Sequence, residues 1–124
     1  MRKRVAILCF VAVSLWAMGG LRAAGTAPVV LVVVNSAAPN PFGAYLPEIL
    51  RAEGLTAFTV TDLGSLSQPT LDAAALVLLA ETTLTAPQVS LLTTFVNGGG
   101  RLVAMRPDPQ LYGLLGIGAA AGTT

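Results

Sequence analysis

The run VVLVVV at residues 29–34 constrains the fold of this 124-residue chain more than any other stretch. It contains no polar position, so a strand formed by it must be buried on both faces. Strands of that kind belong to parallel sheets that carry helices on both sides. Residues 74–80 and 101–106 are further apolar runs of strand length, and residues 56–61 (TAFTVT) predict one more strand between them and the first.

The segments between these strands have helical spacing or loop composition. Residues 43–53 place four apolar side chains on one helical face, and Pro47 is expected in the first turn, where its missing N–H costs nothing. Residues 62–70 read as a loop with one short helical turn near its end. Thr85 and Gln88 have the spacing of a capping box, which predicts the start of a second long helix.

The alternation of strands and helices predicts one α/β domain over residues 28–117, with three layers, a doubly wound and mostly parallel sheet, and right-handed crossovers. Residues 118–124 form a tail of small residues. A doubly wound sheet usually has a fifth strand with further helices, so the fold is expected to be incomplete at its C-terminus. Either the chain is the N-terminal fragment of a longer protein, or a partner subunit completes the sheet.

Three consecutive glycines, Gly98, Gly99 and Gly100, raise the question of a phosphate-binding loop. Such loops run from a strand into a helix, so that the helix N-terminal amides face the anion. Here the order is reversed, from a predicted helix into a predicted strand. The glycines are therefore interpreted as a helix stop, with the first of them in the left-handed conformation that ends a helix.

The N-terminus has the order of a secretory signal peptide. Residues 1–4 are basic, residues 5–18 are apolar apart from one serine, and residues 19–24 are small. Cleavage after Ala23 or Ala24 would leave a periplasmic or extracellular protein. The alternative is an uncleaved N-terminal anchor, although the apolar run is shorter than the roughly 20 residues of a membrane span.

Charge and reactive side chains exclude several classes of function. Without residues 1–24 the chain keeps three arginines and six acidic residues, a net charge of −3, so there is no basic surface for nucleic acid. Cys9 is the one cysteine, lies in the predicted leader, and is accompanied by no histidine anywhere. A Ser-His or Cys-His mechanism and a histidine metal site are therefore excluded within this chain, and no cofactor motif is present.

Candidate ligand contacts follow the predicted strands, because ligands of open parallel sheets bind beyond the strands' carboxyl ends. The loops after the first, third and fourth strands supply the ligand-binding candidates, which are Asn35, Asn40, Glu81, Arg106 and Asp108. The alternative for Arg106 is an ion pair with Glu81 or Asp108 that only shapes this edge, and the two asparagines also suit turns. No residue is assigned as catalytic, as a metal ligand or as a cofactor contact.

Residues 40–55 (NPFGAYLPEILRAEGL), the segment 79–111 and the strand 29–34 resemble the class I glutamine amidotransferase-like fold, which is flavodoxin-like. They are most similar to the non-catalytic versions at the front of large secreted bacterial proteins, and the resemblance covers residues 28–117. Active amidotransferases carry a cysteine on a sharp turn after a strand near the fourth one. The corresponding turn here reads MRPD from Met105 to Asp108, so the resemblance implies the fold without glutamine hydrolysis.

Two functional hypotheses follow. The first is an exported, catalytically silent binding or structural module, the front part of a larger surface or carbohydrate-associated protein. The second is a hydrolase or sugar-processing enzyme that uses Glu81, Arg106 and Asp108 in the crevice, since two carboxylates beside an arginine can perform acid–base chemistry when their pKa values differ.

Overall fold

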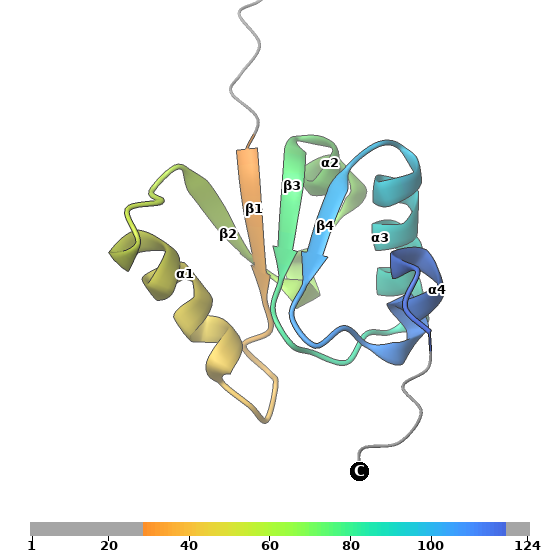
Figure 1. Ribbon diagram of the computed structural model, residues 1–124, viewed down its shortest axis with the longest axis horizontal. Coiled ribbons are helices and arrows are strands. Elements are labelled where there is room, and N and C mark those ends of the chain that lie inside the picture. The colour runs from red at the N-terminus through yellow and green to blue at the C-terminus, as the bar shows by residue number, and fades with distance from the viewer. Residues whose placement is uncertain (1–28, 119–124) are drawn as a thin grey trace, which may run out of the picture.

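The computed structural model describes residues 29–118, and the predicted signal peptide lies outside them. Four parallel strands form one sheet in the order β2-β1-β3-β4 (Figure 1). The strands are β1 (Val29–Val34), β2 (Phe58–Asp62), β3 (Ala74–Leu79) and β4 (Arg101–Ala104). The chain is therefore an α/β domain with a parallel sheet, as predicted, and the valine-rich strand lies in its interior.

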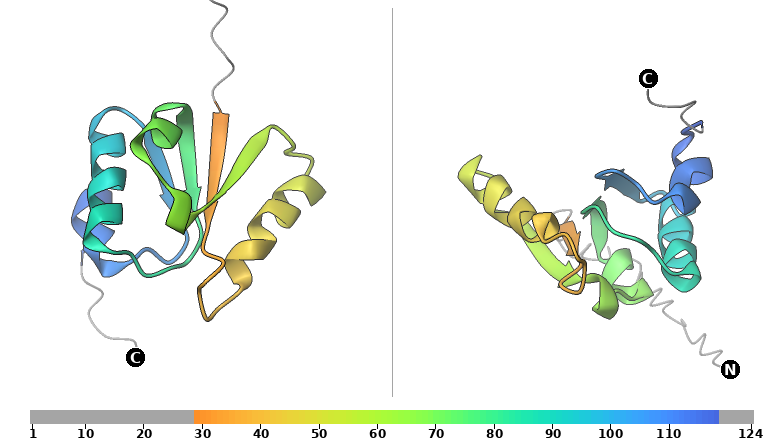
Figure 2. Two further views of the ribbon diagram at one scale, coloured as in Figure 1. Left: turned by 180° about the vertical axis from the view of Figure 1, so that it is seen from behind. Right: turned by 90° about the horizontal axis from the view of Figure 1, so that it is seen from below.

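Helices lie on both faces of the sheet and give three layers (Figure 2). Helix α1 (Phe42–Ala52) packs on β1 from one face, whereas α2 (Gln68–Asp72) and α3 (Ala86–Asn97) contact each other on the opposite face. This is the doubly wound arrangement that right-handed crossovers produce. The remaining elements are two short 3-10 turns and a short helix: η1 (Leu63–Ser65), η2 (Pro109–Leu111) and α4 (Tyr112–Leu115).

The main core lies between the sheet and the helices α2 and α3. Alternate residues of β1 and β3 point into it and meet two buried side chains of α3. Its central members are Leu31, Val33, Val77, Leu79, Leu92 and Phe95. Burial of aliphatic side chains at about 25 cal/mol per Å² is the main source of stability for a sheet with so few charges.

The opposite face of the sheet is covered unevenly. One row of side chains crosses it, because Val32 of β1 pairs in register with Val60 of β2 and with Leu78 of β3, which in turn pairs with Val103 of β4. Val32 is fully buried, whereas Val60 and Val103, at the two sheet edges, are each 44% exposed. No helix within residues 29–118 lies over the β3–β4 half of this face (Figure 2).

Several details of the secondary structure differ from the sequence-based prediction, and strand β2, predicted at residues 56–61, begins only at Phe58. Pro47 lies inside α1 and not in its first turn, because the helix begins at Phe42; the proline ring is buried and leaves the Gly43 carbonyl without its usual partner. Strand β4 ends at Ala104, two residues before the predicted end, since Arg106 adopts a φ of 43° that no strand residue has.

The glycine segment ends a helix, as predicted, but the left-handed residue is the second glycine and not the first. Gly98 keeps a right-handed conformation with φ of −76°, and Gly99 has φ of 98°. Gly100 is required for another reason. A β-carbon at this position would lie 2.3 Å from the Phe95 ring, so only a residue without a side chain leaves room for that ring in the core.

We expect Gly100→Ala to lower the free energy of unfolding by about 2 kcal/mol, because the added methyl group overpacks the Phe95 ring. Gly113→Ala is the control, since a β-carbon there meets no atom within 4 Å and alanine favours the helix. Urea denaturation of both variants tests this. Equal stability of the two variants would show that the ring does not need the glycine.

Candidate functional site

The five residues predicted as ligand contacts line one crevice of about 410 Å³ at the carboxyl ends of the strands. It is formed by the loops after β1, β3 and β4, where an open parallel sheet places its ligand site. Its predicted members are Asn35, Asn40, Glu81, Arg106 and Asp108. The parallel topology explains why residues separated by up to 73 positions meet there, since Asn35 and Asp108 each follow a strand that ends at this edge.

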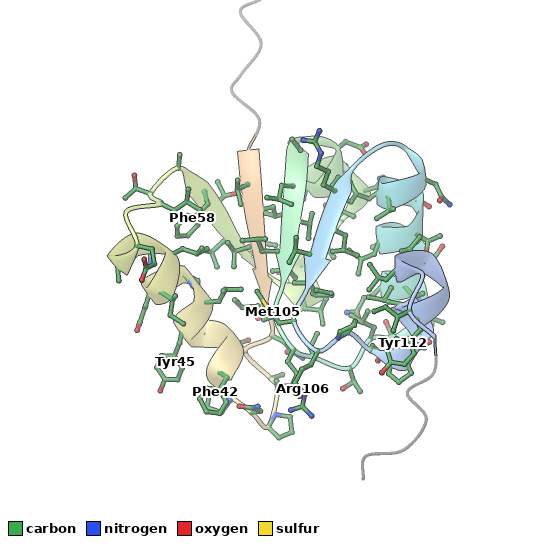
Figure 3. The ribbon with its side chains drawn as sticks, viewed as in Figure 1. Phe42, Tyr45, Phe58, Met105, Arg106 and Tyr112 are labelled. Carbon is green, nitrogen blue, oxygen red and sulfur yellow. The ribbon has the colours of Figure 1, made fainter. Side chains whose placement is uncertain are left out.

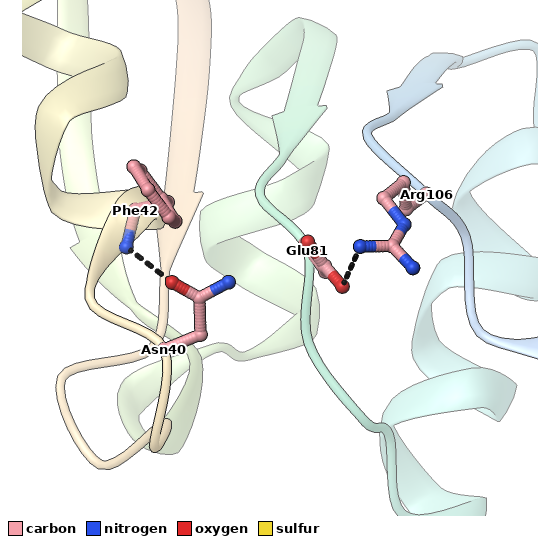
Figure 4. Close-up of polar contacts among 4 residues, drawn as sticks. All are labelled: Asn40, Phe42, Glu81 and Arg106. Atoms are coloured by element: carbon pink, nitrogen blue, oxygen red, sulfur yellow. Dashed lines mark hydrogen bonds and ion pairs between the residues drawn. The ribbon is translucent and has the colours of Figure 1, made fainter.

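The two asparagines serve the loops in which they lie. The Asn35 side-chain oxygen accepts a hydrogen bond from the Ala37 amide at 3.0 Å, and its amide nitrogen donates to the Thr82 hydroxyl at 2.8 Å. Asn40 accepts from the Phe42 amide at 3.1 Å, where α1 begins (Figure 4). Asn35 thus ties the loop after β1 to the loop after β3, and Asn40 forms a turn.

Asp108 is the buried charge of the site, with 8% of its surface exposed. One carboxylate oxygen accepts from the Gln110 amide at 2.9 Å and the other from the Leu84 amide at 2.9 Å. These hydrogen bonds, that from Gln110 first, hold the pKa of Asp108 below its ordinary value. The carboxylate therefore stays ionised at neutral pH and fixes the loop after β3 to the segment after β4.

Glu81 and Arg106 form the predicted ion pair, with 3.1 Å between guanidinium nitrogen and carboxylate oxygen (Figure 4). The Arg106 side chain is 83% exposed and the Glu81 side chain 38%, so the pair is a weak source of stability. The backbone conformation of Arg106 differs from the extended one predicted for residues 101–106. Its φ of 43° lies in the left-handed region, which costs a non-glycine residue energy. No pattern in the sequence around Arg106 indicates this conformation.

Asp62, the last residue of β2, lies at the same edge and is not among the predicted ligand contacts. Its carboxylate accepts from the backbone amides of Ser36 and Gly64, each at 2.8 Å. Hydrogen bonds from the Ser36 side chain and from these two amides hold the pKa of Asp62 below its ordinary value. Asp62 therefore anchors the loop after β1, and its place at the end of β2 was the one available signal.

The side chains of the crevice are better suited to binding a ligand than to acid–base catalysis. Both oxygens of Asp108 already accept backbone hydrogen bonds, and Glu81 is the neighbouring carboxylate, joined to Arg106. Within residues 29–118, no three His, Cys, Asp or Glu side chains gather as metal ligands would. The described helices also include none of the length and apolarity that a membrane span requires.

Comparison of the chain with family models, curated proteins and solved structures gives no match. The amidotransferase-like resemblance therefore stays a prediction, and the case for function rests on the geometry of the crevice.

Proposed function

We propose that this protein is an exported, non-catalytic binding module whose crevice at the strand carboxyl ends recognises a polar ligand. In this proposal residues 1–24 are removed on export. The module is the amidotransferase-like front part of a larger surface or carbohydrate-associated polypeptide, or joins a partner subunit that completes its sheet. The observation that carries the binding role is the strained, exposed Arg106 beside Glu81.

The conformation of Arg106 is informative because strain persists where the surroundings enforce it, and such residues cluster at binding and catalytic sites. The left-handed turn directs a guanidinium with five donors to the rim of the crevice, next to a carboxylate that only accepts. A polyhydroxylated or acidic sugar meets both requirements, since its hydroxyls donate to Glu81 and its oxygens accept from Arg106. A surface ion pair contributes too little stability to account for the strain.

An enzyme that uses Glu81 and Asp108 as an acid–base pair is the weaker candidate. Acid–base catalysis needs a carboxyl group free to take up and release a proton near the operating pH. Asp108 is committed to two backbone amides, which favour its ionised form. If activity or ligand binding is unchanged in the Glu81→Gln and Asp108→Asn variants, the enzyme hypothesis fails.

We expect Arg106→Ala to weaken the binding of galacturonate oligomers at least tenfold, because a charge-assisted hydrogen bond contributes about 1.5–3 kcal/mol. Arg101→Ala is the matched control: Arg101 is an exposed arginine at the other end of the same strand. Binding is measured by two-dimensional NMR on the chain that starts at Gly25, with neutral cello-oligosaccharides as a second probe.

Chemical-shift changes are expected in the loops that line the crevice and at no other edge of the sheet. Two results would contradict the proposal: no shifts with either sugar class, or shifts that persist unchanged in Arg106→Ala.

A further inference from the structure

A second concave surface, the α1–β4 groove, lies beside the crevice on the incompletely covered face of the sheet. It has a volume of about 410 Å³ and lies between helix α1 and the residues that follow β3 and β4. Its apolar lining consists of Phe42, Tyr45, Leu46, Ile49, Ala80 and Met105. Figure 3 shows Phe42, Tyr45 and Met105 toward the carboxyl end of the sheet.

The apolar side chains of the groove are largely open to solvent. Phe42 is 71% exposed, Ile49 55% and Met105 45%. Phe42, Tyr45 and Ile49 follow one another at spacings of three and four, so they form a single stripe along α1. A contiguous apolar surface of this kind on a small domain is typical of a place where another molecule binds.

The groove and the crevice share two lining residues, Glu81 and Arg106. Their ion pair, at 3.1 Å, joins the residues that follow β3 and β4 and forms the boundary between the two concave surfaces (Figure 4). The crevice side carries Asn35, Asn40 and Asp108, whereas the groove side is apolar. A molecule that fills both must therefore be polar at one end and apolar at the other.

We propose that the ligand is a glycoside whose sugar lies in the crevice and whose aromatic aglycone lies in the α1–β4 groove. This inference rests on the proposed function, in which Arg106 and Glu81 recognise the sugar. Sites for small molecules combine an apolar lining with a few polar groups that fix the orientation of the ligand. The groove and the crevice together have this composition, and each has a volume in the usual range of ligand pockets.

The groove contains side chains that bind aromatic rings. The rings of Phe42 and Tyr45 meet edge to face, with 6.2 Å between centroids and 61° between planes. A third ring can extend this arrangement, because aromatic pairs favour offset or edge-to-face contacts at about 4.5–7 Å. Met105, which follows β4, adds a thioether sulfur, and such sulfurs make favourable contacts with ring edges.

The charges of the two linings are compatible with this placement. The charged residues are Glu81, Arg106 and Asp108. Asp108 is buried and accepts from two backbone amides, and it does not line the groove. Glu81 and Arg106 neutralise each other at the boundary, so an uncharged ring in the groove faces no unpaired charge. The planar Arg106 guanidinium can also stack on the aglycone, as Arg51 does on Phe58 at 5.1 Å.

We expect phenyl β-galacturonide to bind the full chain roughly tenfold or more tightly than methyl β-galacturonide, because its ring buries apolar surface that the methyl group lacks. Both probes carry the same sugar and the same charge, so the difference in affinity reports the groove alone. Two-dimensional NMR titrations measure both affinities. The phenyl probe should shift the amides of Tyr45 and Met105 together with those of the crevice loops.

Tyr45→Ala removes one ring from the groove and should reduce the ratio of the two affinities by about threefold or more. Tyr112→Ala is the matched control and should preserve the ratio. Tyr112 is the other tyrosine of the chain, and it lies in α4, away from both concave surfaces (Figure 3).

The outcomes separate this inference from the proposed function. Equal affinities for the two probes would overturn the inference and leave sugar binding in the crevice intact. Binding of neither probe would overturn both. A dimer of the ligand-free chain that Tyr45→Ala dissociates, detected by analytical ultracentrifugation, would also overturn the inference and would assign the groove to a second copy.

Discussion

Replacement of Asp108 by alanine is expected to lower the free energy of unfolding by about 3 kcal/mol, one of the two largest effects in the domain. The substitution leaves the Leu84 and Gln110 amides without the carboxylate that accepts from both. Asp108 lies almost entirely out of contact with solvent, so water does not readily replace it. The loops after β3 and β4 should loosen together, which hydrogen exchange of the Leu84 amide would report.

The pH dependence of the free energy of unfolding tests whether the ionised form of Asp108 is the stabilising one. The pKa of Asp108 is lower in the folded chain than in the unfolded chain, so its contribution is present at neutral pH and is lost as pH falls below about 4 toward the folded pKa. Urea denaturation at pH 7 and pH 3 should therefore show a smaller difference between the native chain and Asp108→Asn at the lower pH. The same difference at both pH values would mean that the ionised carboxylate is not the stabilising species.

Leu92→Ala is expected to cost about 3 kcal/mol, because Leu92 is fully buried where α3 meets the sheet and its removal leaves a cavity. Leu91→Ala is the matched control in the same helix, since Leu91 is only partly buried against the same core. We expect about half the effect at Leu91, measured by urea denaturation of both variants. Equal effects would place the main contact of α3 on a different side of the helix.

Much of the fold follows from local patterns, and the exceptions have identifiable causes. Four strands and two long helices are visible as apolar runs, and the Gln88 side chain does accept from the Thr85 amide at 2.9 Å, as the capping box predicts. Pro47 could not be placed correctly, because burial of its ring against the sheet is a tertiary effect. Three identical residues in a row carry no local signal that selects Gly99 over Gly98 as the left-handed residue.

The sequence was sufficient to predict which residues line the crevice, but not which of them already form hydrogen bonds within the protein. The rule that parallel strands end at one edge was sufficient to bring Asn35, Glu81 and Arg106 together. Whether a polar side chain is free or already bonded to a backbone amide depends on distances of a few tenths of an ångström, which composition and spacing do not encode. Asp108 was therefore predicted as a ligand group, although it holds two loops in place, as Asp62 also does.

The central position of β1 also determines when the sheet can be completed during synthesis. Val33 pairs with Leu79, which lies 46 residues later in the chain, so β1 cannot gain its second neighbour until most of the domain has emerged. Until then the VVLVVV segment has β2 as its one possible strand partner, with its other edge open. A chain that emerges slowly thus leaves this apolar strand edge open for longest, and during that time it can pair with the same segment of another copy.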